Sequence, residues 1–457
     1  MILVYSGILL GAKVQLDVAE KVAKSIYIEK SNLHSEIDFN VVGVETIKSE
    51  ELDLLYLFHL APVGFIIVPA DDQAVPVLAF GFEHTFESAD MPLNLQYVMN
   101  VYTNELLEMI NNPATPDSEI SGQWDYYLSN GVEADRSRDV SPLIDAKFNQ
   151  SGSWNNGVTA ATGFNGPVGC VAVAMSQVMH YWKYPESGTG SNFYTENDLG
   201  YLEVDFSDAN YDFGNMAATY ATAPSQLLLY HAGVSVNMDY ENGGSGAWVV
   251  GSYPSALYAM ENFFSYSDQV YTVWKDNYST TEFRNIIKEQ LDNGLPVIYS
   301  GYDSSDGGHA WNVDGYQGNN LHCNWGWGGW NNGYYNVSSM GGFPTDQAAL
   351  IDLIPEPLTN PMALFEYEII DNTIIFIDIS QEINISNITQ WTWSFGDGNS
   401  QTSSDGFCEY TYDTPGTYTA SLYVTNEFGQ SGQSHFETFE IGSSLIGDIN
   451  SDTTINI

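Results

Sequence analysis

Three residues whose side chains can together carry out acyl transfer occur in a widely spaced order in this chain. Cys170 stands in "GPVGCVAVAMSQVMHYWKYP", His309 follows two glycines in "GGHAWNVDGYQ", and Asn324 lies shortly after it in "NLHCNWGW". A cysteine nucleophile needs a base that takes the thiol proton and a third group that orients this base. Cysteine, histidine and asparagine in this order could therefore act as nucleophile, acid–base and orienting group.

The segment around Cys170 predicts a buried helix with the cysteine at its start. Residues 171–182 are apolar almost all round, which is typical of a helix inside a core. Pro167 and Gly169 mark its beginning, and Pro185 marks its end because proline cannot continue a helix. Free N–H groups and the dipole at a helix N-terminus lower a thiol pKa and favour the thiolate. The alternative is that Cys170 is a small, unreactive core residue.

His309 and Asn324 are predicted to lie on two neighbouring strands joined by a short turn. Adjacent antiparallel strands can place two side chains opposite one another. Asn324 would then bind one ring nitrogen of His309 and leave the other facing Cys170. Asp314 is an alternative orienting group, but on a regular strand it points to the opposite face from His309.

A metal site is another use for this region, since His322 and Cys323 could join His309. Alternation along a strand argues against it, because His322 and Asn324 face one way and Cys323 the other. Cys323 is therefore predicted to fill the core. Trp325 either fills the core or shields the contact between histidine and asparagine from water.

The motifs "TGFNGPVGCVAVAMSQVMHYWKYP" and "GGHAWNVDGYQ…NWGWGG" together resemble the streptopain family of secreted bacterial cysteine peptidases, which have a papain-like fold. The resemblance implies that Cys170 is the nucleophile and His309 the base. It implies that Asn324 and Trp325 orient and cover that histidine. Upstream, "AKFNQSGSWN" resembles the segment that carries the family's oxyanion glutamine, which falls on Gln150. The implied reaction is hydrolysis of protein or peptide substrates, without a cofactor or metal.

The resemblance also implies the fold class and the N-terminal organisation. An α+β fold is expected, with a papain-like peptidase of one helical and one antiparallel β lobe over residues 136–354. "GFIIVPADDQAVPVLAFGF" is similar to the prosegment of these enzymes, so residues 1–135 are expected to form an α+β propeptide that inhibits its own peptidase. The polar stretch at 133–139 is the expected cleavage region. Residues 1–12 are either a signal remnant or a first strand.

A linker is expected at 355–361, and the sequence after it predicts a second domain that differs from the peptidase. Residues 362–442 alternate in short strands, as in a β-sandwich, and resemble a PKD domain, an accessory module of secreted bacterial hydrolases. Residues 446–457 resemble a truncated dockerin loop. The weak calcium ligands in that loop would be Asp448, Asn450 and Asp452.

Composition limits the partners. The chain has 457 residues, and 12 Lys+Arg against 58 Asp+Glu give a formal net charge of −46. Such a surface repels nucleic acid and anionic membranes, so neither is expected as a partner. No apolar run is long enough to span a bilayer. The three cysteines do not suggest a disulfide framework.

These observations predict the zymogen of a monomeric bacterial cysteine endopeptidase that is secreted or held at the cell surface. Two alternatives remain open at this point. The same three side chains could transfer an acyl group to a non-peptide acceptor. The protein could also be a non-catalytic adhesin built on a peptidase fold.

Overall fold

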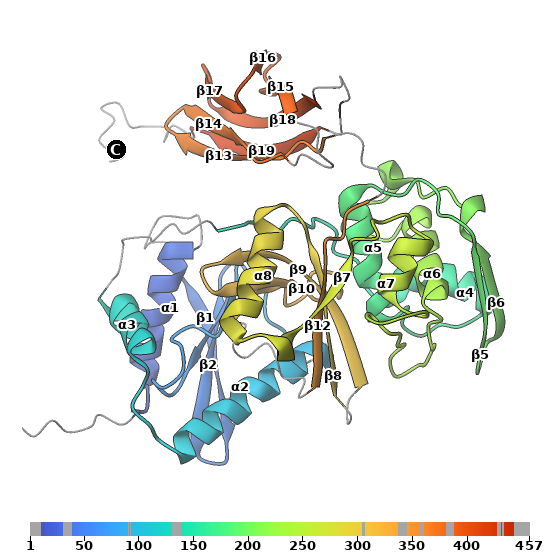
Figure 1. The fold of residues 1–457 in the computed structure, drawn as a ribbon. Helices are drawn as coiled ribbons and strands as arrows, with labels where there is room; N and C mark the ends of the chain where they lie inside the picture. Colours follow the sequence, from blue (N-terminus) through green and yellow to red (C-terminus); the bar gives the residue numbers. More distant parts are fainter. Residues whose placement is uncertain are drawn as a thin grey trace, which may run out of the picture. The chain divides into compact units, whose positions relative to one another are not determined.

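The computed structural model describes residues 11–30, 39–89, 91, 93–129, 139–303, 307–336, 345–355, 361–380, 388–426, 431 and 434–442. The chain divides into two compact units, Met1–Pro355 and Glu356–Ile457 (Figure 1). Four sequence predictions lie wholly or largely outside the described residues: the signal remnant through residue 10, the polar stretch at 133–138, the linker at 356–360, and the dockerin-like loop with Asp448, Asn450 and Asp452.

The predicted prosegment is an α+β arrangement at the start of the first unit. The apolar positions of its first helix, such as Val22 and Ile26, recur at helical spacing and are buried against strands. Its elements are α1 (Leu16–Lys30), β1 (Val41–Ser49), β2 (Leu52–Leu60), β3 (Phe65–Pro69), β4 (Ala79–Gly81), α2 (Leu93–Asn111) and α3 (Ser118–Leu128).

A helical lobe follows. It contains α4 (Asn156–Thr162), α5 (Cys170–Trp182), the hairpin β5 (Ser191–Glu196) and β6 (Gly200–Asp205), α6 (Ala223–Ser235), α7 (Ala256–Asn262), and the short 3₁₀-helices η2 (Gly152–Asn155), η3 (Phe206–Asp208) and η4 (Phe213–Asn215). Helix α5 is buried along almost its whole length, as its apolar sequence predicts. Pro185 follows it closely, so the helix ends where the sequence indicates.

The β lobe supplies the second half of the peptidase region. Its elements are β7 (Tyr271–Trp274), η5 (Lys275–Asn277), α8 (Thr280–Asp292), β8 (Val297–Asp303), β9 (Gly307–Gln317), β10 (Asn320–Asn324), β11 (Gly333–Asn336) and β12 (Thr345–Ile351). The two lobes, one helical and one of antiparallel strands, agree with the predicted fold class. Among the described helices, none combines the length and the apolar character needed to cross a membrane.

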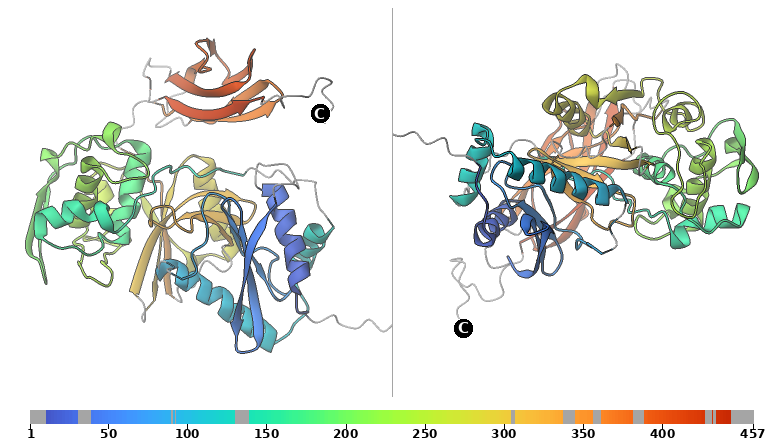
Figure 2. Two further views of the ribbon diagram at one scale, coloured as in Figure 1. Left: turned by 180° about the vertical axis from the view of Figure 1, so that it is seen from behind. Right: turned by 90° about the horizontal axis from the view of Figure 1, so that it is seen from below.

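One sheet runs through both the prosegment and the β lobe, in the strand order β1-β2-β3-β4-β11-β10-β9-β8-β12-β7. The junction is the antiparallel pair β4–β11, in which Tyr334 lies opposite Phe80. A single buried cluster contains Leu55 and Phe65 of the prosegment together with Trp311 and Trp325 of the β lobe. Figure 2 shows the prosegment and the helical lobe at opposite ends of this sheet. The prosegment is therefore an extension of the peptidase sheet and shares its core.

The second unit is a β-sandwich, as predicted. Its strands are β13 (Phe365–Ile370), β14 (Thr373–Asp378), β15 (Ile388–Ser394), β16 (Ser400–Ser403), β17 (Phe407–Thr411), β18 (Gly416–Asn426) and β19 (His435–Ile441). They form two sheets, β13-β14-β17 and β16-β15-β18-β19, which enclose Trp393 and Cys408. Asp397 and Gly398 lie in the turn between β15 and β16, where Asp397 accepts a hydrogen bond from the backbone of Asn399.

Candidate active site

Cys170 is the first residue of α5, and the backbone just before it favours glycine. Gly169, the N-cap, has φ +97°. A Cβ at this position would lie 2.5 Å from Sδ of Met238. The positive φ is a conformation that other residues rarely adopt, so it favours glycine at this position. The "GPVGC" sequence therefore places the thiol at the helix N-terminus.

The Cys170 thiol is nevertheless protected from ionisation. Its side chain is buried, and this burial raises its pKa above the ordinary value. Hydrogen bonding from the backbone at Ala310, Val171 and Cys170 itself opposes the shift but is outweighed. The backbone N–H groups at the start of α5 thus lower the thiol pKa as expected, but desolvation is the larger effect, so the net shift in this full-length state is upward.

His309 lies near the start of β9, the strand that packs against α5. Its ring is half-buried, and the residue pairs with Gly301 on β8. The next residue, Ala310, provides the backbone contact to the Cys170 thiol. The nucleophile candidate and the base candidate are thus brought to the same place by α5 and β9, although the sequence separates them widely.

Asn324 ends β10, the neighbouring strand, but the register differs from the simple expectation. Its partner on β9 is Asn312, not His309. The register shift between His322 and Cys323 moves this partner one residue toward His309. Asn324 still lies on the face of the sheet that carries the Asn312 side chain and not the His309 side chain. The fully buried carboxamide of Asn324 accepts a hydrogen bond from Gln177 and donates one to the Ala146 carbonyl.

Trp325 is fully buried in the shared core. Its indole N–H donates to the carbonyl of Asn331 at 3.1 Å, and its backbone N–H donates to Asn332. Its ring lies 5.3 Å from Trp311 and 5.1 Å from Tyr335, centroid to centroid. Of the two interpretations offered by the sequence, core packing is directly visible.

Gln150 lies in the loop before η2 and is buried. Its carbonyl accepts a hydrogen bond from the backbone of Val168 at 2.8 Å, which ties this loop to the segment leading into α5. The neighbouring Asn149 forms a bridge with Trp327 of the "NWGWGG" loop. The loop of Gln150 therefore runs beside the N-terminus that carries Cys170.

The side chains considered for a metal site, or as an alternative orienting group, bind other partners. Nδ1 of His322 lies 2.6 Å from Oδ1 of Asp314, and the second carboxylate oxygen accepts from the backbone of Ile144. Both His322 and Asp314 are thus held in a buried pair of their own. Cys323 is fully buried in the core, as predicted, and burial raises its pKa strongly. Within the described ranges, no group of three or more His, Cys, Asp or Glu side chains could hold a metal ion.

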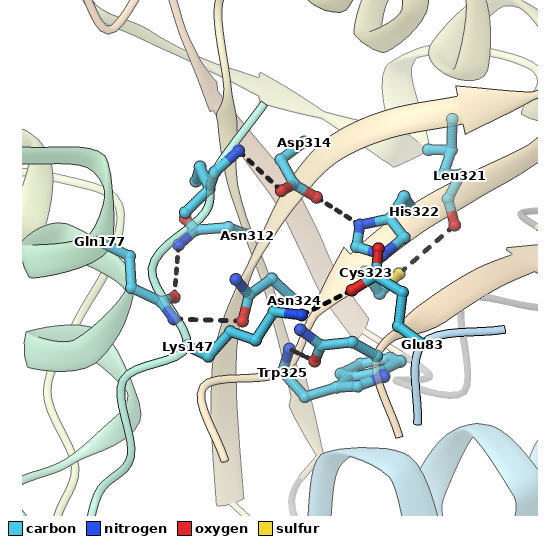
Figure 3. Close-up of polar contacts among 12 residues, drawn as sticks. Glu83, Lys147, Gln177, Asn312, Asp314, Leu321, His322, Cys323, Asn324 and Trp325 are labelled. Carbon is cyan, nitrogen blue, oxygen red and sulfur yellow. Dashed lines mark hydrogen bonds and ion pairs between the residues drawn. The ribbon is translucent and has the colours of Figure 1, made fainter. Parts of the chain in front are cut away.

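Two sets of polar residues near the site were not singled out from the sequence. Gln177 and Asn312 bind one another and reach Asn324, while Lys147 contacts Glu83 and His84 of the prosegment. Figure 3 shows the hydrogen bond between Gln177 and Asn324 and the ion pair between Lys147 and Glu83. The sequence offers one signal for Gln177: with Ser176 and His180, it is one of the few polar residues in the largely apolar helix α5.

Three family models match successive parts of the chain. Residues 11–106 match the Spi protease inhibitor, residues 148–335 match the Peptidase C10 family, and residues 359–441 match the PKD domain. These matches cover the predicted prosegment, the region of the catalytic motifs and the β-sandwich respectively.

Individual relatives match most of the chain. The chain is 27% identical over 384 residues to the thiol protease/hemagglutinin PrtT of Porphyromonas gingivalis, covering 75% of this chain but 42% of that protein. It is 26% identical over 383 residues to streptopain of Streptococcus pyogenes, covering 74% of this chain and 92% of the relative.

A solved structure also matches the first unit. The Prevotella intermedia prointerpain A fragment, a mutant with alanine in place of a cysteine, has a TM-score of 0.53 and 25% identity. The match covers 69% of this chain and 99% of the fragment. Cys170 and His309 both lie within the region that matches the peptidase model. The chain is therefore a cysteine-peptidase zymogen whose residues 148–335 match the Peptidase C10 family, with an inhibitor-like prosegment and a C-terminal PKD domain.

Proposed function

We propose that the protein is an endopeptidase in which Cys170 is the nucleophile and His309 the acid–base. The observation that carries this assignment is the position of Cys170 at the N-terminus of α5, with its thiol against the backbone of Ala310, the residue after His309. The chain offers a second buried cysteine nearby, Cys323, but it is enclosed in the core.

The proposed reaction is acyl transfer in two steps. The Cys170 proton passes to His309 while Sγ forms a bond to the scissile carbonyl carbon. His309 then protonates the leaving amine as the C–N bond breaks, which leaves a thioester on Cys170. Water, deprotonated by His309, attacks this thioester, and its cleavage releases the acid and restores the thiol.

The developing oxyanion needs hydrogen-bond donors. The backbone N–H of Cys170 at the start of α5 is one, since the first N–H groups of a helix have no partner within the helix. The side-chain amide of Gln150 is the proposed second donor, and its loop runs beside that helix end. Asn324 and Trp325 are the proposed pair that orients and covers His309, and Trp325 is the member whose ring packs against Trp311 on the His309 face of β9.

Latency is proposed to come from residues 1–135, with cleavage between about residue 125 and residue 140. The shared sheet supports this, because strands β1 to β4 cannot leave without breaking the β4–β11 pair. The proposed substrates are proteins or peptides, and the enzyme is proposed to act as a monomer. The proposed location is outside the bacterial cell, either secreted or at its surface.

The test is cleavage of casein or a fluorogenic peptide by the purified full-length protein. Cys170→Ala and His309→Ala are expected to abolish turnover and to retain the far-UV circular dichroism of the parent. An irreversible epoxide thiol inhibitor is expected to label the active protein on Cys170 and to leave Cys170→Ala unlabelled. Full peptidase activity in Cys170→Ala would overturn the assignment. Turnover only with a non-peptide acceptor would favour an acyltransferase, and no labelling at all would favour an adhesin.

A further inference from the structure

A single peptide group shortly before Cys170 is held from both sides by hydrogen bonds. The carbonyl oxygen of Pro167 accepts from the side-chain hydroxyl of Ser245 at 2.6 Å. The N–H of the same peptide group, which belongs to Val168, donates to the backbone carbonyl of Gln150 at 2.8 Å. This peptide group therefore joins three separate segments: the loop of Gln150, the segment leading into α5, and the loop of Ser245.

The loop of Ser245 is rich in glycine and packs against the start of α5. Ser245 is 5% exposed, so its hydroxyl is shielded from water. That hydroxyl also accepts from the backbone N–H of Glu241 at 3.3 Å. Two backbone hydrogen bonds between Asp239 and Gly246, at 2.9 and 3.0 Å, close the loop. A Cβ at Gly169 would lie 3.2 Å from the carbonyl oxygen of Ser245, so the loop touches the N-cap of α5.

The two hydrogen bonds act on one rigid plane. A trans peptide group is planar, with its C=O and N–H pointing in opposite directions, so fixing the carbonyl also fixes the direction of the N–H. Hydrogen bonds at the two ends of such a group also polarise and strengthen one another. The Ser245 hydroxyl thus directs the Val168 N–H toward the carbonyl of Gln150. Its loss would free the plane to rotate and would take a partner from the Pro167 carbonyl.

The same peptide group connects the two proposed oxyanion donors. On one side it leads through Gly169 to the backbone N–H of Cys170, and on the other it is bonded to Gln150. We propose that Ser245 is a positioning residue that holds the Gln150 loop against the start of α5 and so sets the spacing between these two donors. The inference rests on the proposed role of Gln150. Ser245 acts through the peptide group, because its one O–H is donated to Pro167.

The main variant is Ser245→Ala, which removes only the hydroxyl. Ser245→Thr keeps a hydroxyl and is the conservative variant. The matched control is Ser255→Ala. Ser255 is also buried, and its hydroxyl donates to the carbonyl of Gly251 at 2.8 Å and accepts from the backbone N–H of Tyr258 at 3.1 Å. The control therefore loses the same kinds of hydrogen bond at the start of α7, without touching the peptide group before Cys170.

Each zymogen is matured with tagged parental enzyme that is then removed, and its functional sites are counted with an irreversible thiol label. Ser245→Ala is expected to lower kcat on a fluorogenic peptide roughly 10- to 100-fold per labelled site, with little change in KM, because a displaced donor stabilises the oxyanion less. Ser245→Thr should retain most of the parental kcat. Ser255→Ala should lower stability and leave kcat per site unchanged.

Alkylation separates this role from a general disturbance of the Cys170 site. Iodoacetamide forms an S–C bond with the thiolate and releases iodide, and no oxyanion develops in that reaction. The matured Ser245→Ala enzyme should therefore be alkylated at the parental rate and with the parental pH dependence, although its peptide turnover is low. A variant in which Cys170 or His309 is itself displaced would lose both reactions.

A double variant tests the path through Gln150. If Ser245 acts by placing Gln150, adding Ser245→Ala to Gln150→Ala will produce no further loss of kcat per site. Four results would overturn the inference: parental kcat in Ser245→Ala, an equal fall in its alkylation rate, a Ser245→Thr enzyme as slow as Ser245→Ala, or losses that multiply in the double variant. Failure of the proposed function would be recognised separately, by activity in Cys170→Ala or by a fully active Gln150→Ala.

Discussion

Nζ of Lys147 in the peptidase lies 2.6 Å from Oε2 of Glu83 in the prosegment and 3.1 Å from Nε2 of His84. A Cβ at Gly329 would lie 2.8 Å from Cδ of Lys147 and 2.9 Å from the His84 ring, so this contact is packed against the "GWGGW" loop. The Lys147 side chain therefore links the prosegment to the loop that follows Trp325.

Breaking this ion pair is expected to speed maturation. Glu83→Gln removes the charge that Lys147 faces, and because the pair is partly exposed its contribution is modest. The rate at which active enzyme trims the Cys170→Ala zymogen should rise about two- to fivefold at low ionic strength, and less at high salt. Densitometry of the full-length band over time measures this rate.

The control is Glu45→Gln, which removes an acidic partner of His59 at 2.7 Å inside the prosegment. It changes a contact of similar length that lies within the prosegment and does not cross to the peptidase. Equal acceleration by Glu45→Gln and Glu83→Gln would mean that general loosening of the prosegment, and not the contact with Lys147, controls trimming.

Mild acid is expected to weaken the same contact through His84. Burial and the neighbouring Lys147 charge lower the pKa of His84 below its ordinary value, although Glu83 opposes the shift. A histidine with a lowered folded pKa binds its proton more readily once the contact opens. Its stabilising contribution is complete above about pH 6.5 and is lost as the pH falls toward the lowered value.

Trimming of the Cys170→Ala zymogen should therefore accelerate between about pH 7 and pH 5.5 more than trimming of the same zymogen carrying His84→Gln. Comparing the two substrates at each pH cancels the pH dependence of the added enzyme. His59→Gln, which changes a histidine inside the prosegment, should behave like the parent. A parental pH response in His84→Gln would exclude this histidine as the titrating group.

The full-length protein should react slowly with thiol reagents at neutral pH. Burial raises the pKa of Cys170, so the neutral thiol predominates there and the reactive thiolate is scarce. Iodoacetamide labelling of Cys170, followed by mass spectrometry, should increase as the pH rises past the ordinary thiol range, about 8.5. Cys170→Ala should lose this labelled site. A rate that is already at its plateau at pH 7 would show that a charge pair with His309 outweighs burial.

Much of the site could be predicted because short runs of sequence specify the elements that carry its residues. The glycine before Cys170, the apolar helix after it and the strand that carries His309 are each specified by short runs of sequence. The β-sandwich, whose core contains Trp393 and Cys408, was likewise predicted from alternating strands. Strand β12 is less evident from its own residues, because it is held between β8 and β7, which lie well before it in the chain, and pairing stabilises a strand as much as its own residues do.

The features of the site that the sequence did not predict depend on tertiary structure. The opposition of Asn324 and Asn312 is set by the register of β9 and β10, which a one-residue shift changes. The raised pKa of Cys170 depends on how completely the folded chain removes it from water, which the residues around it in sequence do not determine. The extension of the peptidase sheet by β4 could not be predicted, because two edge strands distant in sequence meet there.

Cys323 provides a final test of the distinction between a reactive and a structural cysteine. It lies in the core near Trp325 and Tyr335, fully buried, and its Sγ is 3.8 Å from the carbonyl of Leu321. Cys323→Ser places a hydroxyl in this apolar environment, and the free energy of unfolding should fall by about 1–3 kcal/mol. Denaturant unfolding in a Cys170→Ala background measures this loss without self-digestion. In the active background, kcat per labelled site should remain parental. A Cys323→Ser protein that folds and binds the thiol label but does not turn over would show that this cysteine contributes to catalysis.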